Sequence, residues 1–194
     1  MARTQFDRDH VIRQSTQLFW QYGYSGSSMQ QVFKATGLKP GSVYLAFGSK
    51  EGLYREALDA YAEETLAHIT RVIEKAPSVG EGICQILEAM VADTQAKAYC
   101  SCFLIKSQLE LAAERHELQA YASDQLKRIE QVYAQYLQLD DVDVAQLRAC
   151  SIMLHIFGVR VYGYMEPQQQ NLLAGLQAGL PWLPWDKRSA WILS

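Results

Sequence analysis

Gly23, Gly37 and Gly48 divide the first fifty residues into short segments, and this division limits what the N-terminus can fold into. Before Gly23, apolar residues recur at steps of three and four from Asp9 to Tyr22, the spacing of one helix face. Glycine ends a helix without steric cost because it adopts the left-handed conformation. The sequence therefore predicts three short helices, over residues 9–22, 29–35 and 40–47.

The starts of the second and third helices carry their own signals. Ser28 is followed three residues later by Gln31, which is the pattern of a capping box. Pro40 stands at the first position of the third helix, where its missing N–H would be unpaired in any case. Two short helices joined by a glycine turn form a helix-turn-helix, whose second helix enters the major groove of DNA.

The rest of the chain also favours helices, because Leu, Ala and Gln outnumber Val, Ile and Thr. Ser49 is positioned to cap a long fourth helix. We predict an all-α fold, with a three-helix head in residues 1–55 and a helical bundle for dimerisation and ligand binding in residues 56–194. The helices expected after the head cover residues 50–75, 81–96, 101–114, 117–138, 143–164 and 167–180.

Charge separates the same two regions. Residues 1–55 hold seven Lys or Arg against three Asp or Glu, a net charge of +4, whereas the remainder holds eleven against eighteen, a net charge of −7. A basic module on an acidic body is typical of a DNA-binding head attached to a body that does not bind DNA.

The remaining composition indicates a soluble cytoplasmic protein. The sequence contains no uninterrupted run of about 18 apolar residues, the length that a transmembrane helix needs. Residues 1–5 also lack the apolar core of a signal peptide. The four cysteines are therefore expected to be thiols. We predict no cofactor and no metal site, because Cys100 and Cys102 lack a second ligand pair at zinc-like spacing and the histidines are scattered.

The segment from Ser28 to Leu53 strongly resembles the DNA-binding signature of the tetracycline-repressor (TetR) family. The Leu18–Phe19 pair and Gly23–Tyr24 fit the same pattern, so the specific resemblance covers about residues 9–55. It implies a homodimeric repressor that binds palindromic operator DNA and is released by a small ligand in its C-terminal domain. We predict no enzymatic activity, because the sequence shows no nucleophile-base pair, glycine-rich phosphate loop or metal-ligand spacing.

The resemblance and the helix positions together indicate the residues that contact DNA. Side chains near the start of the third helix can reach base edges or phosphates, and Pro40 and Ser42 stand where family members vary. A cation at a helix N-terminus, such as Lys50, interacts unfavourably with the helix macrodipole. A DNA phosphate beside Lys50 would make the position of this cation favourable. Tyr44 packs between helices, reaches a phosphate, or both, and Ser28 caps or also contacts DNA. The predicted DNA contacts are Ser28, Lys39, Pro40, Ser42, Val43, Tyr44 and Lys50.

An effector site is expected in the C-terminal domain. Cys102 opens a helix, resembles a cysteine of a subgroup that responds to electrophiles or oxidants, and has Lys106 four residues further on the same face. A cysteine there also fits a small apolar filler. Arg160 stands in the most apolar helix and needs a partner, either an acid across a dimer or an anionic effector. The predicted sensor residues are Cys102, Phe103, Lys106, Tyr133 and Arg160.

Helices 143–164 and 167–180 are the predicted dimer interface. The first is apolar nearly all round and must be covered on every side. The second carries a leucine stripe, while Gly175 and Gly179 allow a neighbouring helix to come close. The apolar tail at residues 181–185 and Trp191 is expected to pack on the body or the partner.

Two alternatives belong to other classes of protein. One is a thiol-based enzyme, for which only the cysteines argue. The other is a helical protein-interaction module that does not bind DNA. For a repressor, the recognition helices of the dimer must be about 34–36 Å apart to enter successive major grooves. A signal that favours another spacing would release the DNA, and helix 50–75 would transmit it.

Overall fold

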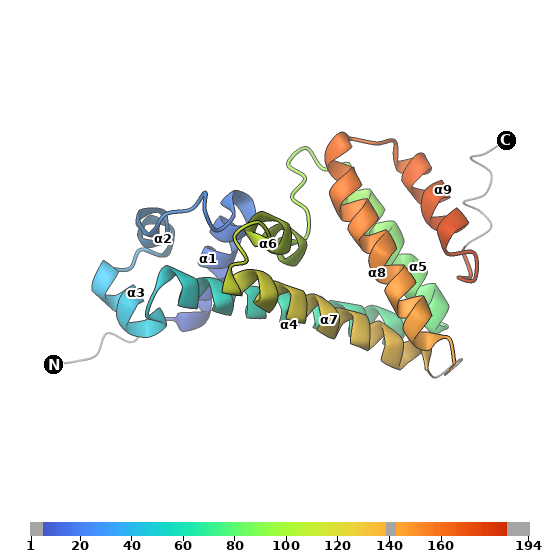
Figure 1. Cartoon of the computed structure of the whole chain (residues 1–194), viewed down its shortest axis with the longest axis horizontal. Helices are drawn as coiled ribbons and strands as arrows, with labels where there is room; N and C mark the ends of the chain where they lie inside the picture. Colours follow the sequence, from blue (N-terminus) through green and yellow to red (C-terminus); the bar gives the residue numbers. More distant parts are fainter. Residues whose placement is uncertain (1–5, 139–142, 186–194) are drawn as a thin grey trace. The chain divides into compact units, whose positions relative to one another are not determined.

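The computed structural model describes residues 6–138 and 143–185, and all regular structure in these ranges is helical (Figure 1). The all-α prediction is confirmed. The predicted helix ends differ from the observed ones by at most three residues. The elements are α1 (Arg8–Tyr22), α2 (Met29–Thr36), α3 (Pro40–Phe47), α4 (Lys50–Lys75), α5 (Val79–Asp93), α6 (Phe103–Leu111), α7 (Glu117–Leu137), α8 (Ala145–Tyr162), the 3-10 turn η1 (Gly163–Met165) and α9 (Gln169–Gly179).

Contacts between residues divide the chain into two compact units. The first comprises residues 1–64 and 102–126, so it adds α6 and the start of α7 to the N-terminal helices. The second comprises residues 65–101 and 127–194. The long helices α4 and α7 each contribute to both units. The predicted domain boundary at residue 55 stays a prediction.

Local capping explains where the first helices begin and end. The Ser28 hydroxyl accepts a hydrogen bond from the Gln31 backbone N–H at 3.3 Å, and the Gln31 side chain accepts from the Ser28 N–H at 2.7 Å. Gly37, at φ +68°, donates its N–H to Phe33 and ends α2. Pro40 is the first residue of α3. These caps confirm the predicted starts and stops of the helix-turn-helix.

The first unit has an aromatic core that joins the head to α6. The Tyr54 ring centroid lies 4.8 Å from that of Phe19 and 5.2 Å from that of Phe103. The Tyr61 ring also contacts that of Phe103 edge to face, with centroids 5.8 Å apart. Aromatic pairs of this kind contribute about 0.5–1.5 kcal/mol each beyond the area they bury. The head is therefore packed on α6 as well as on α4.

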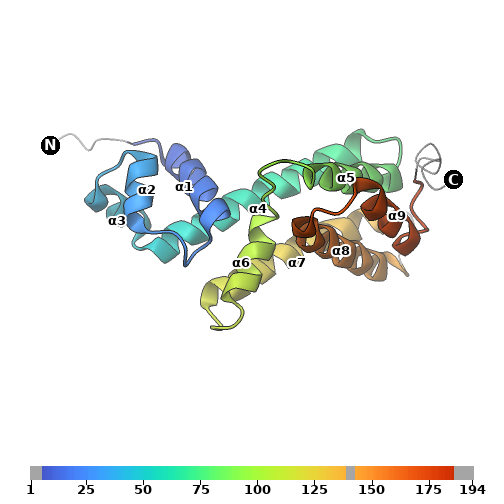
Figure 2. The ribbon, with the colours of Figure 1, turned by 90° about the horizontal axis from the view of Figure 1, so that it is seen from above.

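In the second unit, α5, α8 and α9 pack on one another (Figures 1 and 2). The chain after α9 turns back onto this unit. Leu183 is buried, and the Arg148 guanidinium lies 4.8 Å from the centre of the Trp182 ring. The predicted packing of the tail is confirmed for residues 181–185, and Trp191 lies outside the described residues.

Candidate nucleic-acid interface

Helix α3 presents one face to solvent and buries the other in the head. Of the large side chains, Tyr44 is 45% and Leu45 is 80% exposed, whereas Phe47 is buried. Lys39, at the N-cap of α3, and Pro40 are also exposed, and Ser42 is half-buried. The exposed face thus begins at the N-terminal end of α3, the end expected to meet base edges.

Val43 is not on this face, and its prediction as a DNA contact is wrong. Its side chain is fully buried, together with Val11, Phe19 and Val32. A buried valine contributes about 1.5–3 kcal/mol by leaving water. Val43 therefore anchors α3 to the core of the head and has no surface for a base or phosphate.

The residues predicted from sequence to contact DNA do not include Leu45, although the spacing along α3 indicates that Leu45 lies on the exposed face. Residues two positions apart on a helix lie on nearly opposite sides, since each residue turns about 100°. Leu45 stands two positions from both Val43 and Phe47, and both are buried. The spacing that assigns these two residues to the core also assigns Leu45 to the solvent face.

Tyr44 both packs and remains accessible. Its ring contacts that of Phe33 on α2 edge to face, with centroids 6.0 Å apart. Its 45% exposure leaves part of the side chain available to a partner. The two interpretations of Tyr44 are compatible in this geometry.

The Lys50 ammonium is bound within the head. It donates to the carbonyl oxygens of Tyr24 and Ser27, the second at 2.6 Å, and lies 4.4 Å from the centre of the Tyr24 ring. Partial burial lowers the pKa of Lys50, and the nearby Glu110 carboxylate opposes that effect. Carbonyl oxygens and an aromatic face thus compensate this cation at the start of α4. A phosphate contact by Lys50 stays a prediction.

Helix α6 holds the turn between α1 and α2 with two side chains one helical turn apart. The Glu110 carboxylate accepts from the backbone N–H groups of Tyr24 and Ser25 at 3.0 and 2.8 Å. The Lys106 ammonium donates to the carbonyl oxygen of Trp20, near the end of α1. Carbonyls at a helix end lack intrahelical partners, so Lys106 satisfies one of them. The predicted thiolate partner of Cys102 thus has a structural contact with the head.

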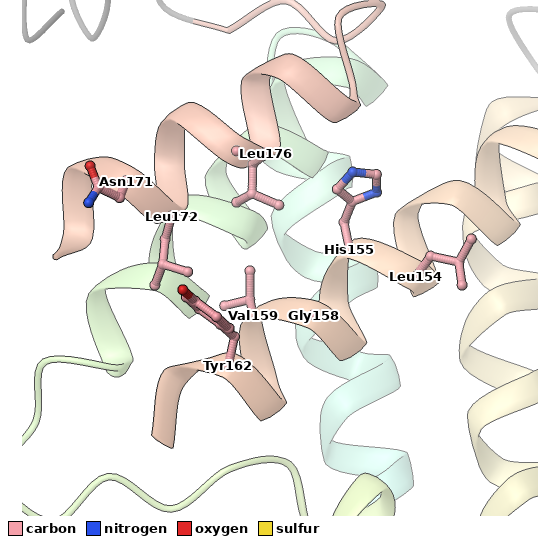
Figure 3. Close-up of a pocket in the computed structure, with 9 residues that line it drawn as sticks. Leu154, His155, Gly158, Val159, Tyr162, Asn171, Leu172 and Leu176 are labelled. Atoms are coloured by element: carbon pink, nitrogen blue, oxygen red, sulfur yellow. The ribbon is translucent and has the colours of Figure 1, made fainter. Parts of the chain in front are cut away.

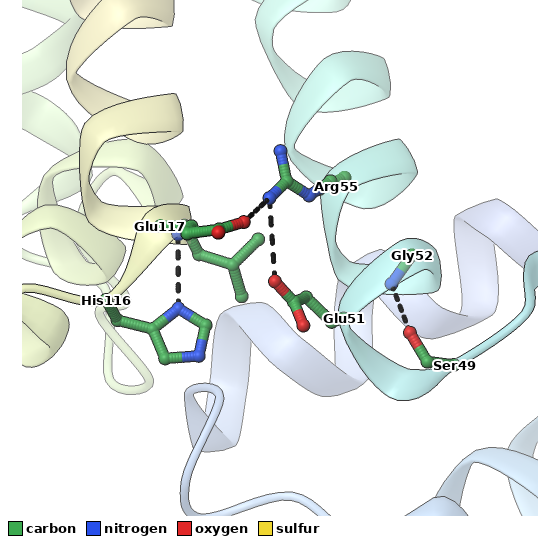
Figure 4. A network of polar contacts seen from close by, with 7 residues as sticks. Ser49, Glu51, Gly52, Arg55, His116 and Glu117 are labelled. Carbon is green, nitrogen blue, oxygen red and sulfur yellow. Dashed lines mark hydrogen bonds and ion pairs between the residues drawn. The ribbon is translucent and has the colours of Figure 1, made fainter.

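A second polar contact joins α4 to α7 within the first unit (Figure 4). The Arg55 guanidinium lies 2.8 Å from the Glu117 carboxylate and 3.5 Å from that of Glu51. Beside it, His116 Nδ1 accepts from the Leu118 N–H at 3.1 Å and caps α7. Glu117 is 81% exposed, so this ion pair contributes about 1 kcal/mol or less.

The predicted sensor residues fall in both units. Cys102, Phe103 and Lys106 belong to the first unit, where Cys102 is the half-buried N-cap of α6 and Phe103 is buried in the aromatic core. Tyr133 and Arg160 belong to the second. The four cysteines are outside any disulfide, as the thiol prediction requires. Their role in sensing stays a prediction.

Arg160 has a partner within its own chain. Its guanidinium lies 3.3 Å from the Asp93 carboxylate on α5, and the Arg160 side chain is 15% exposed. The sequence predicts an acid from a partner subunit or an anionic effector at this position, whereas in the structure the acid comes from the same unit. Tyr133 is fully buried, its hydroxyl has no hydrogen-bond partner, and burial raises its pKa.

Helices α8 and α9 border an open apolar groove of about 440 Å³ (Figure 3). Exposed side chains recur at intervals of seven along α8: Leu147 is 73%, Leu154 is 68% and Val161 is 45% exposed. The groove is lined by Leu154, His155, Gly158, Val159, Tyr162, Asn171, Leu172, Gly175 and Leu176.

Two kinds of site are not found in the described parts of the chain. No three His, Cys, Asp or Glu side chains in residues 6–138 and 143–185 are grouped to hold a metal ion. None of the helices described here combines the length and apolar character needed to cross a bilayer.

Comparisons with known proteins agree with this geometry. Residues 11–57 match the family profile described as bacterial regulatory proteins, tetR family. The repressor ComR of Escherichia coli (strain K12) is 30% identical over 115 residues, which are 58% of this chain and 55% of ComR. The uncharacterised HTH-type regulator YezE of Bacillus subtilis (strain 168) is 30% identical over 133 residues, 66% of this chain and 67% of YezE. The chain thus spans about half the length of ComR.

Similarity to solved structures extends over nearly the whole chain. A cysteine mutant of the TetR-family regulator CifR, complexed with 26-bp double-strand operator DNA, matches with a TM-score of 0.77 and 26% identity. The match covers 95% of this chain and 100% of that one. The fold and the head define a helix-turn-helix regulator. The chain belongs to the TetR family of bacterial regulatory proteins, which supports a regulator in preference to an enzyme.

Proposed function

We propose that the chain represses transcription by binding palindromic operator DNA as a homodimer and that a small molecule, electrophile or oxidant releases it. The observation that carries the proposal is α3, a packed helix whose exposed face starts at Lys39. Its relative CifR was solved on operator DNA. Because its proposed target is chromosomal DNA, we propose that the protein acts in the cytoplasm.

Charge and position support the DNA contacts. Lys39 is exposed at the start of α3, where it reaches a phosphate or a guanine. Ser42 and Tyr44 lie within the next turn and a half, and Pro40 stands between them and Lys39. Ser28 is exposed at the N-terminus of α2, an end whose free N–H groups favour phosphate.

A matched pair of lysine variants tests DNA binding. Lys39→Ala removes a head cation, whereas Lys97→Ala removes an exposed cation of the second unit. We expect Lys39→Ala to weaken binding to a selected duplex and to reduce the salt slope by about one phosphate contact. Lys97→Ala should match the unmodified protein. If neither the unmodified protein nor its variants show salt-sensitive affinity for any duplex, the proposal of DNA binding is refuted.

The exposed face of α8 is our proposed dimer interface, together with α9. Leu147, Leu154 and Val161 form an apolar stripe, and a Cβ at Gly158 or Gly175 would meet no atom within 4 Å. Open space of this kind beside leucines allows close approach of a second copy's helices. A twofold dimer also supplies the second recognition helix that a palindrome requires.

Leucine-to-glutamate variants test the interface. Leu154→Glu places a charge in the middle of the stripe, and Leu109→Glu places one on α6, where Leu109 is 55% exposed. Light scattering during size-exclusion chromatography should give a dimer for the unmodified protein and Leu109→Glu, and a monomer for Leu154→Glu. A dimeric Leu154→Glu would exclude this face.

The release step is proposed to act through the predicted sensor residues and α4. Cys102 is the N-cap of α6, and this helix holds the α1–α2 turn through Lys106 and Glu110. We expect Cys102→Ser to keep DNA affinity and to lose release by a thiol-reactive compound. Release that is unchanged in Cys102→Ser would favour a non-covalent ligand in the second unit, near Tyr133 and Arg160.

A further inference from the structure

The exposed face of α3 has an unusual chemistry for a helix that recognises bases. Leu45 is 80% exposed, the highest value among the exposed large hydrophobic side chains of the described residues. Helix α3 contains no Asn, Gln, Asp, Glu or Arg. These are the side chains that make paired or charge-assisted hydrogen bonds to base edges. Direct hydrogen bonding from α3 is therefore limited to Ser42, Tyr44 and, at its N-cap, Lys39.

A large apolar side chain on such a helix has one apolar target in the major groove. Among the four bases only thymine presents a methyl group there, on C5. We propose that Leu45 recognises the 5-methyl group of a thymine in each half of the operator. This inference rests on the proposed DNA-binding function and adds a specificity-determining residue to it.

The backbone next to Leu45 favours such a contact. Gly41 stands four residues earlier, on the same side of the helix, and a Cβ built there would meet no atom within 4 Å. No side chain projects from position 41 beside Leu45, so a base edge can approach the backbone of α3 there. The leucine then projects beyond that surface, while Val43 and Phe47 fix α3 from behind.

The test removes the methyl group and leaves the protein unchanged. Full-length protein first selects duplexes from random DNA. Each thymine of the most enriched duplex is then replaced by deoxyuridine, in both half-sites at once, and dissociation constants are measured at one salt concentration. Two lost methyl contacts, each comparable to a buried methylene, predict about tenfold weaker binding at one thymine position.

Leu45→Ala identifies the side chain responsible. For this variant the same uracil substitution should change affinity less than about twofold, because the contact is already lost. Leu109→Ala, an exposed leucine on α6, should retain the full sensitivity of the unmodified protein. Circular dichroism checks that the helical content of both variants is unchanged.

The outcomes separate this inference from the function on which it rests. If a duplex is selected and bound but no thymine position is sensitive, or if Leu45→Ala keeps the sensitivity, the assignment of Leu45 is overturned and DNA binding stands. If no duplex is enriched and affinity does not respond to salt, both are overturned.

Discussion

A buried pair of hydroxyl groups links α4 to α6, and the direction of its hydrogen bonds can be worked out. The Tyr54 and Ser107 hydroxyl oxygens are 2.7 Å apart, and both residues are fully buried. The Ser107 hydroxyl also donates to the Phe103 carbonyl oxygen at 2.8 Å. Because serine has a single hydroxyl proton, Tyr54 must be the donor to Ser107.

This direction predicts unequal costs for the two single substitutions. Ser107→Ala leaves the buried Tyr54 hydroxyl without an acceptor and should lower the free energy of unfolding by about 1–3 kcal/mol. Tyr54→Phe leaves Ser107 bonded to Phe103 and should cost about 0.5–1.5 kcal/mol. In the double variant no unsatisfied hydroxyl remains, so it should be more stable than the sum of the single costs implies.

Urea unfolding of the four proteins, followed by circular dichroism at one protein concentration, measures these differences. Equal slopes with urea are needed for the free energies to be compared. The reasoning is refuted if Tyr54→Phe costs more than Ser107→Ala, or if the two costs simply add in the double variant.

Three further predictions concern the head and the second unit. Glu110→Gln removes the charge that holds the α1–α2 turn and should lower the free energy of unfolding, measured by thermal melts, by about 1 kcal/mol. The control Glu114→Gln, also at an exposed position, should have little effect. Equal melting temperatures of the two variants would exclude a role for the Glu110 carboxylate. Val43→Ala should lower unfolding free energy by about 2 kcal/mol, while Leu45→Ala should change it by less than about 0.5 kcal/mol; the opposite order would mean that the face of α3 is misassigned. Burial raises the pKa of the Cys84 thiol to about 12, so the unfolded chain loses this proton first as pH rises and stability should fall above about pH 9. Cys84→Ala should show a shallower decline between pH 9 and 11 in urea titrations, and an unchanged slope would contradict this account.

Local signals made the head predictable from sequence. The capping box at Ser28 and the left-handed Gly37 depend only on residues within one turn, so their spacing was sufficient to place α2. The same holds for Pro40 at the start of α3. Val43 shows the limit of this reasoning, because its position near the start of the helix predicts a DNA contact, whereas the packing of α3 on the head buries its side chain.

Contacts between distant segments could not be predicted in this way. Lys106 and its partner Trp20 are 86 residues apart, and Arg160 and Asp93 are 67 apart. Nothing in the local pattern of a lysine or an arginine specifies which distant carbonyl or carboxylate it meets. Sequence reasoning indicated correctly that Arg160 needs a partner, and only the packing of α5 and α8 identifies it.

The contacts of α6 also explain why Gly23 is needed at the end of α1. Gly23 has φ +76°, a conformation that other residues adopt at a cost. A Cβ there would also collide with the Glu110 carboxylate. The glycine therefore serves two purposes, since it lets the chain turn and leaves room for the carboxylate that binds Tyr24 and Ser25. Any substitution at Gly23 must disturb the turn and its attachment to α6 together, so the two cannot be separated at this position.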